Sequence, residues 1–284
     1  MESSAWDGRY GIVVACDIAV YAQGPARCTG GAGSAAILIG PNAPITIDPL
    51  RASYMENAYD FYKPDPTTEY PTVAGQYSID CYLRALDYCY TSLLEKRRVS
   101  HYSDLADFYV FHSPFTKMIR KAWNKLIHTD VTLNPNNHGN LGATSRQQQL
   151  DFSNKSIYEM VNNYTKESWD TCVAPGTLLG TQLGNLYTGS VFVGLMSLMD
   201  KVDIVGKKVA VFSYGSGLSS SLFTMCFKEG AGSVLEKIRA VNEIEPRLSR
   251  RIKLDPVEYT RRMNQREVDY LKNDYRTQDS IDEL

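Results

Sequence analysis

Residues 108–114 read Phe-Tyr-Val-Phe-His-Ser-Pro, and this stretch decides the class of fold that we predict. Its four leading residues are aromatic or β-branched, which predicts a short strand. Ser113 is a good N-cap and Pro114 suits the first position of a helix, so a helix is predicted to begin there. From 115 to 127 the apolar residues fall on one helical face and the basic residues on the other. A strand that passes directly into a helix is typical of α/β folds, and it places His112 at the junction.

Further apolar runs extend this pattern along the chain. Residues 10–16 and 34–39 each predict a buried strand, and a Gly-rich turn between them would make the two strands sheet neighbours. Residues 207–213 predict another strand. The turn 214–217 then leads into the apolar segment 218–226, which we interpret as a helix. These alternations predict an α/β layered fold that binds ligands near the C-terminal ends of its strands.

Helical periodicity predicts the other helices. Ser78 is a candidate N-cap for a helix over 78–94, and Asn185 for a helix over 186–200. Helices are also predicted over 152–168 and, in the heavily charged last 55 residues, near 234–241 and 259–271.

Two segments show little periodicity. Residues 41–76 are rich in Pro, Tyr and Asp and predict a long irregular connection, a kind of segment that often carries function. Residues 129–150 are polar and rich in Asn and Gln, which predicts an exposed loop or a disordered insertion.

Composition narrows the classes of function. The chain has 30 Lys and Arg against 32 Asp and Glu, a formal net charge of -2, so no global positive field would attract nucleic acid or an anionic membrane. No apolar run approaches the roughly 20 residues that span a bilayer. The six cysteines form no CxxC pair, which indicates free thiols in a reducing compartment; we expect the cytoplasm, with the mitochondrion as the alternative. No metal-ligand spacing or cofactor motif appears, so neither a metal nor a cofactor is expected.

His112 is the leading candidate for chemistry. A neutral imidazole at the strand-to-helix junction could donate a hydrogen bond to a thioester or ketone oxygen, or it could serve only as packing. Lys117 and Lys121 lie one turn apart on the following helix, where they could bind the phosphates of one ligand or form a solvated face.

Other candidates are less specific. The turn at 214–217, Tyr-Gly-Ser-Gly, lets backbone approach a ligand closely, although most such turns are only turns. Asp17 and Asp60 could orient a site or make ordinary turn and capping contacts. The candidate nucleophiles are Cys28, which lies beside Arg27 and a Gly-rich turn, and Cys16. The other four thiols are interpreted as packing or incidental residues.

Several stretches together resemble one family, the hydroxymethylglutaryl-CoA synthases, whose fold is thiolase-like. The resemblance rests on residues 17–21 (DIAVY), 29–31 (TGG), 39–44 (IGPNAP), 58–65 (AYDFYKPD), 111–114 (FHSP), 184–188 (GNLYT) and 212–217 (FSYGSG). Their order and rough spacing match the family over most of the chain, and 129–175 is the weakest part. As a set these stretches are highly specific.

The resemblance implies roles for particular residues. His112 corresponds to the catalytic histidine, which helps to bind acetoacetyl-CoA and polarises its reacting carbonyl. The implied coenzyme A contacts are Ser78, Lys117 and Lys121; the positions around the acyl group are Thr29, Asn185 and Ser216; and the supporting carboxylates are Asp17 and Asp60. Cys28 stands where the family usually has proline, and Pro25 where it usually has a CoA-contacting asparagine.

The resemblance also implies a reaction and a division of the chain. In the family, acetyl-CoA acylates a cysteine, a glutamate removes a methyl proton, the resulting carbon attacks acetoacetyl-CoA, and water releases 3-hydroxy-3-methylglutaryl-CoA. We expect residues 1–48 to be the closing strands of the N-terminal thiolase-like half and 49–284 to be the C-terminal domain.

On this expectation, the cysteine and glutamate of the family precede Met1. The chain alone would then be inactive, with open strand edges and exposed apolar surface. The complete enzyme is expected to be a homodimer that uses coenzyme A thioesters as substrates. The alternative is a non-catalytic CoA-binding or dimerisation partner of a full-length synthase.

Overall fold

A four-stranded mixed sheet forms the centre of the computed structural model, which describes residues 4–147 and 150–276. Its strand order is β3 (Ile45–Met55), β8 (Ser219–Phe227), β7 (Lys208–Gly215) and β6 (Phe108–Phe111). β6 runs parallel to β7, whereas β8 is antiparallel to both of its neighbours.

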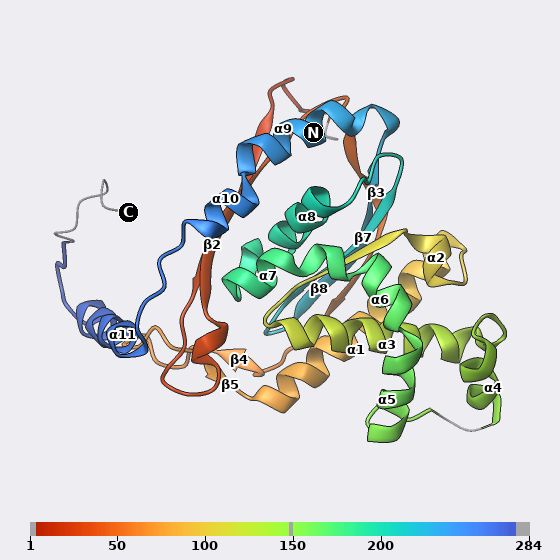
Figure 1. Ribbon diagram of the computed structural model, residues 1–284, viewed down its shortest axis with the longest axis horizontal. Helices are drawn as coiled ribbons and strands as arrows, with labels where there is room; N and C mark the ends of the chain where they lie inside the picture. Colours follow the sequence, from red (N-terminus) through yellow and green to blue (C-terminus); the bar gives the residue numbers. More distant parts are fainter. Residues whose placement is uncertain (1–3, 148–149, 277–284) are drawn as a thin grey trace.

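Helices cover both faces of this sheet (Figure 1). One face carries α1 (Gly75–Arg97) and α3 (Thr116–Leu133), and the other carries α8 (Ser190–Lys201) and α9 (Gly232–Asn242). Because successive strand residues point to opposite faces, the neighbours along β6 and β7 divide between the two cores. The core with α1 and α3 contains Tyr109, Phe111, Ala210 and Phe212, and the core with α8 contains Val110, Val209 and Val211.

The other elements surround this three-layer arrangement. They are β1 (Gly11–Ala19), β2 (Gly31–Ile39), β4 (Phe61–Tyr62), β5 (Thr72–Val73), α2 (Tyr102–Leu105), α4 (Gly139–Gln147), α5 (Lys155–Tyr164), α6 (Lys166–Cys172), α7 (Leu178–Leu183), α10 (Ile244–Ser249) and α11 (Pro256–Tyr270), with 3-10 turns at Arg27–Thr29, Pro135–Asn137, Ala174–Thr177, Tyr187–Gly189 and Glu229–Ala231. Among the described residues, no helix is both long enough and apolar enough to span a membrane.

β1 and β2 pair only with each other, as an antiparallel hairpin, in the part of the chain that the structure describes. They are neighbours, as predicted, but the prediction that they are buried is wrong: Ile12 is 69% exposed and Leu38 is 66% exposed. The hairpin contacts the rest of the chain along one side, against α7 and the Tyr187–Gly189 turn. Ile12, Val14 and Leu38 therefore have no cover within the described chain, whereas the small residues Ala15, Ala19 and Ala35 are buried.

Three predictions about secondary structure are wrong. Residues 41–76 contain the 11-residue strand β3 and are not one irregular connection. Residues 218–226 form a strand, β8, which returns beside β7 instead of crossing over as a helix. Residues 129–150 are largely folded as the end of α3, a 3-10 turn and α4, and bury side chains such as His138 and Leu141.

The predicted helix caps also differ from those observed. α3 begins at Thr116 with the extended Phe115 as its N-cap, because Ser113 is held in the loop by Ser190. The Ser113 N–H donates to Ser190 Oγ at 3.0 Å, and the Ser190 hydroxyl donates back to the Ser113 carbonyl at 3.1 Å. α1 begins three residues before Ser78, whose own N–H already donates to the Ala74 carbonyl at 2.8 Å.

Candidate active site

Asp60 is a buried hydrogen-bond acceptor that joins three separate segments. It lies between β3 and β4 and its side chain is inaccessible to solvent. One carboxylate oxygen accepts from Ser78 Oγ and from Tyr214 Oη, each at 3.0 Å, and the other accepts from the Gly217 N–H at 3.0 Å. A buried carboxylate needs such donors to replace water. Asp60 thereby fixes the start of α1 and the β7–β8 turn relative to the connection that follows β3.

His112 follows β6 directly and is held through its backbone. Its N–H donates to the Phe212 carbonyl at 2.8 Å, and its carbonyl accepts from Tyr82 Oη at 2.8 Å. The imidazole is stacked on the Tyr82 ring with 6.4 Å between centroids. Only 8% of the residue is exposed, and burial lowers the pKa of His112 to about 4. The ring is consequently uncharged at neutral pH, so its N–H group can donate a hydrogen bond and its other nitrogen can accept one.

Tyr214 connects His112 with Asp60. Its ring centroid lies 6.4 Å from that of His112 and 4.9 Å from that of Tyr82, while its hydroxyl reaches the Asp60 carboxylate. Burial, followed by the negative charge of Asp60, raises the pKa of Tyr214, and the neighbouring Ser216 side chain acts weakly in the opposite direction. Tyr214 therefore stays protonated and donates to Asp60.

Asn185 and Thr29 form a second group at the connection between β1 and β2. The Asn185 N–H donates to the Thr29 carbonyl at 2.8 Å. The Asn185 amide donates to Tyr21 Oη at 2.9 Å and accepts from the Tyr187 N–H at 2.9 Å. Asn185 thus closes a local turn rather than capping α8, which begins at Ser190.

Aromatic rings link this second group to Asp60. Phe61, the residue after Asp60, packs edge-to-face against Tyr21 at 6.4 Å and against Tyr187 at 5.9 Å. Such edge-to-face contacts are favourable beyond the area that they bury. The two groups are therefore parts of one packed region.

Three of the predicted residues lie at the margin of this region. Lys117 is exposed and Lys121 is half-buried, one turn apart near the start of α3 and shortly after His112. Asp17 lies within β1, not at its end, and its carboxylate accepts from Thr188 Oγ1 at 3.3 Å. The structure brings Asp60, Ser78, Ser216 and His112 together around Tyr214, and Thr29 and Asn185 together at the hairpin.

The two candidate nucleophilic cysteines both belong to the hairpin. Cys16 is exposed on β1, and Cys28 is exposed with its thiol 3.2 Å from the Pro25 carbonyl oxygen. All six cysteines are free thiols, which confirms the prediction from their spacing.

Sequence reasoning did not single out Tyr82 and Ser113 as site residues. Ser113 follows His112 in the sequence, and its hydroxyl is buried and has no hydrogen-bond partner among the described residues. Its place beside His112 in the stretch 111–114 was the available signal. Tyr82 had none, because its position resembles any other apolar position of α1.

Comparison with known proteins identifies the family of the chain. The family described as "Hydroxymethylglutaryl-coenzyme A synthase C terminal" matches residues 45–284, and the one described as "Hydroxymethylglutaryl-coenzyme A synthase N terminal" matches residues 1–44. Hydroxymethylglutaryl-CoA synthase A of Dictyostelium discoideum is 46% identical over 284 residues, covering 96% of this chain and 58% of that protein. The Saccharomyces cerevisiae synthase is 39% identical over 302 residues, covering 100% of this chain and 60% of that protein.

Solved structures show the same fold. MvaS in complex with 3-hydroxy-3-methylglutaryl coenzyme A superposes with a TM-score of 0.74 at 27% identity, over 90% of this chain and 60% of that one. An HMG-CoA synthase complexed with CoA gives 0.67 at 28% identity, over 89% and 56%. The chain spans about three fifths of the length of these relatives. The thiolase-like α/β fold that the resemblance implied is confirmed. The chain belongs to the hydroxymethylglutaryl-CoA synthase family.

Proposed function

We propose that this chain forms the acetoacetyl-CoA side of the active site of a synthase that condenses acetyl-CoA with acetoacetyl-CoA to 3-hydroxy-3-methylglutaryl-CoA. The observation that carries the proposal is the buried, uncharged His112, held at the end of β6 beside Tyr82 and Tyr214. An imidazole N–H in a site of low polarity is a strong hydrogen-bond donor to a carbonyl oxygen.

The proposed step needs such a donor. The methyl carbon of the acetyl group, after losing a proton to a base, forms a bond to the ketone carbon of acetoacetyl-CoA, and the ketone oxygen acquires negative charge. His112 donates to that oxygen and stabilises the charge as it develops. We propose that Asp60 keeps Tyr214 and the β7–β8 turn in place around the imidazole, and that Asp17 supports the hairpin side.

We propose that the coenzyme A contacts are Ser78, Lys117 and Lys121, and that Thr29, Asn185 and Ser216 surround the acyl group. The nucleophilic cysteine and the base glutamate would come from a part of the fold outside these 284 residues. The 284 residues alone are then expected to bind acetoacetyl-CoA without condensing it, because proximity and the thiolate supply most of the rate. The location would be the cytoplasm, with the mitochondrion as the alternative, since one relative from Sus scrofa is a mitochondrial synthase.

Calorimetric titration of the purified chain with acetoacetyl-CoA tests the binding part of this proposal. Lys117→Ala and Lys121→Ala should each weaken binding about two- to fivefold, as expected for single charge contacts that solvent can reach, and the loss should shrink at high salt. His112→Ala should weaken acetoacetyl-CoA more than free coenzyme A, which lacks the ketone. His128→Gln is the matched control, since His128 is also buried but bonds to the Leu150 carbonyl. Equal affinities for all four variants would rule the proposed site out.

Chromatographic measurement of coenzyme A released from acetyl-CoA and acetoacetyl-CoA tests the catalytic part. We expect no condensation by the 284 residues alone. Turnover comparable to that of a full-length synthase would refute the proposal that the nucleophilic cysteine and the base glutamate come from outside these residues. The binding result would not be affected.

A non-catalytic partner of a full-length synthase is the second candidate. The exposed apolar residues of the hairpin favour it, since Ile12, Val14 and Leu38 would be covered by another chain of the same fold. The complete enzyme is proposed to be a homodimer, and a partner chain would use the same surface. Co-purification of a longer synthase subunit with the tagged chain from its source cells would support this candidate, and recovery of the chain alone would count against it.

A further inference from the structure

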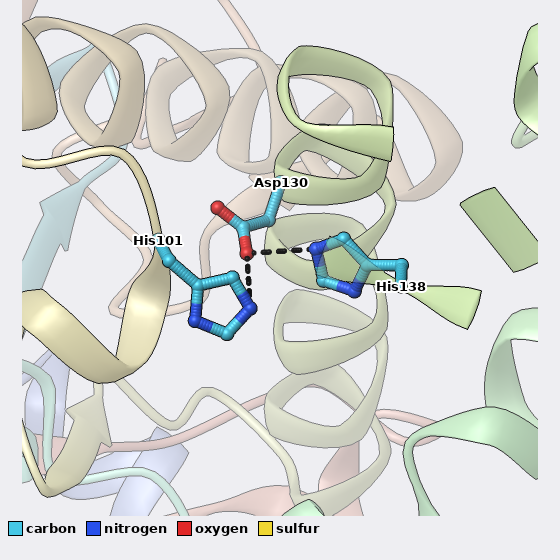
Figure 2. A group of neighbouring side chains, drawn as sticks. All are labelled: His101, Asp130 and His138. Carbon is cyan, nitrogen blue, oxygen red and sulfur yellow. Dashed lines mark hydrogen bonds and ion pairs between the residues drawn. The ribbon is translucent and has the colours of Figure 1, made fainter. Parts of the chain in front are cut away.

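Two histidines and one aspartate from separate segments meet at the far end of α3. His101 immediately precedes α2, Asp130 lies in the last turn of α3, and His138 lies between the Pro135–Asn137 turn and α4. Figure 2 shows both imidazole rings directed at the same carboxylate oxygen. His101 Nε2 lies 3.3 Å and His138 Nε2 lies 3.1 Å from Asp130 Oδ2, and the three atoms are all within 4.8 Å of one another.

This cluster is mostly inaccessible to solvent. The side chains of Asp130 and His138 are fully buried, and that of His101 is 17% exposed. Tyr90 Oη donates to the second Asp130 oxygen at 2.6 Å, which orients the carboxylate. His101 is therefore the side from which a small ligand could enter.

The spacing fits a metal ion of tetrahedral preference. Zinc binds imidazole nitrogen and carboxylate oxygen at about 2.0 Å, so two ligand atoms of a tetrahedral site lie about 3.3 Å apart. The distances of 3.3 Å and 3.1 Å from Asp130 Oδ2 to the two Nε2 atoms are close to this value. Calcium and magnesium prefer sites made of oxygen ligands alone, so a site with two imidazole nitrogens does not suit them.

The outer ring nitrogens also have suitable partners. A histidine that binds a metal through Nε2 usually donates its Nδ1–H to an oxygen. His138 Nδ1 lies 3.1 Å from Tyr164 Oη, which can accept the ring proton once zinc occupies Nε2. His101 Nδ1 lies 2.7 Å from Ser103 Oγ and also accepts from the Ser103 N–H at 3.3 Å, as the N-cap of α2. Zinc binding through His101 Nε2 would move the ring proton to Nδ1, which would then donate to Ser103 Oγ and give up the contact with the Ser103 N–H.

We propose that His101, Asp130 and His138 bind one Zn²⁺ ion, with water in the fourth position on the side of His101. The role is structural, because the ion would tie the segment before α2 to the end of α3 and the start of α4. Asp130 lies about 20 Å along α3 from the end beside His112, at 1.5 Å per residue. The zinc site is therefore independent of the proposed coenzyme A site.

Metal analysis of the untagged chain tests this proposal. The exposed thiols of Cys16 and Cys28 should be alkylated first, so that they do not compete for zinc. After equilibration with Zn²⁺ and gel filtration, we expect one equivalent of zinc per chain and a melting temperature that rises with free Zn²⁺. Substitution by Co²⁺ should give the visible absorption of a tetrahedral nitrogen and oxygen site. No retained metal, or an octahedral cobalt spectrum, would overturn the proposal without any variant.

Variants then assign the ligands. His101→Ala changes the most accessible ligand and should lose the stoichiometric zinc and the zinc-dependent rise in melting temperature. His138→Gln should do the same. His128→Gln, on the same helix but bonded to Leu150, should retain both. Full zinc occupancy in His101→Ala and His138→Gln would place the ion elsewhere and refute the assignment.

Discussion

Replacement of Asp60 by alanine tests the central network most directly. The substitution removes the acceptor of three hydrogen bonds, from Ser78, Tyr214 and Gly217. A hydrogen bond to a charged group contributes roughly 1.5 to 3 kcal/mol, and neighbouring bonds are not additive. Because the Tyr214 hydroxyl would be left buried without its acceptor and the bonds from Ser78 and Gly217 would also be lost, we expect Asp60→Ala to lower the free energy of unfolding by about 4 kcal/mol.

Asparagine at the same position should be much milder. Its carbonyl oxygen can replace only one carboxylate oxygen, so one side of the network is kept and the other is lost. We expect Asp60→Asn to cost about 1 to 2 kcal/mol, roughly one hydrogen bond.

Urea unfolding followed by far-ultraviolet circular dichroism measures both values from the midpoint and the slope. Asp65→Ala is the matched control, because Asp65 is exposed and accepts only from its own turn residue Thr67. It should cost less than about 1 kcal/mol. If Asp60→Ala were no more destabilising than Asp65→Ala, the buried network would not be what fixes this region.

Three further predictions concern single positions. The folded-state pKa of His112 is about 4, below the ordinary 6.5, so the unfolded chain binds more protons between these two pH values. The free energy of unfolding should therefore be at its full value above pH 6.5 and fall toward pH 4. His112→Gln should reduce this dependence on pH, measured as the midpoint of urea unfolding at each pH. Gly31→Ala would put a Cβ 2.2 Å from the last carbonyl oxygen of α7 and should detach the β1–β2 hairpin, which faster proteolysis of the hairpin would show. Gly75→Ala is the control, because a Cβ at Gly75 meets open space and should leave the rate of proteolysis unchanged. Tyr90→Phe removes the buried bond to Asp130 and should cost about 1.5 to 3 kcal/mol in thermal or urea unfolding; an unchanged midpoint would show that the bond is not made.

Local patterns were sufficient for elements with one strong signal. The helix that contains 78–94 was predictable because its side-chain period of 3.6 follows from burial on one face. The strand at 108–111 was predictable because its four residues are aromatic or β-branched. The strand at 218–226 was not, since a short apolar run fits a buried helix equally well. Only its pairing with β7 and β3 decides the matter.

Functional residues followed the same rule. His112 could be located from its own neighbours, because a strand end and a helix start are both local signals. The roles of Tyr82 and Tyr214 depend on contacts across the core, and no local period reports these. His101, Asp130 and His138 meet only because a loop, a helix end and a second loop converge, so their spacing along the chain carried no sign of a cluster.

The pairing of β3 with β8 has a consequence for how the chain is made. β3 ends at Met55 and β8 begins at Ser219, so during translation β3 leaves the ribosome long before its partner exists. Bringing together strands so far apart in sequence costs loop-closure entropy and slows folding. Until then a long strand edge is open to other nascent chains. We therefore expect the yield of folded protein to depend on the rate of synthesis and on chaperones more than on the stability of the finished sheet.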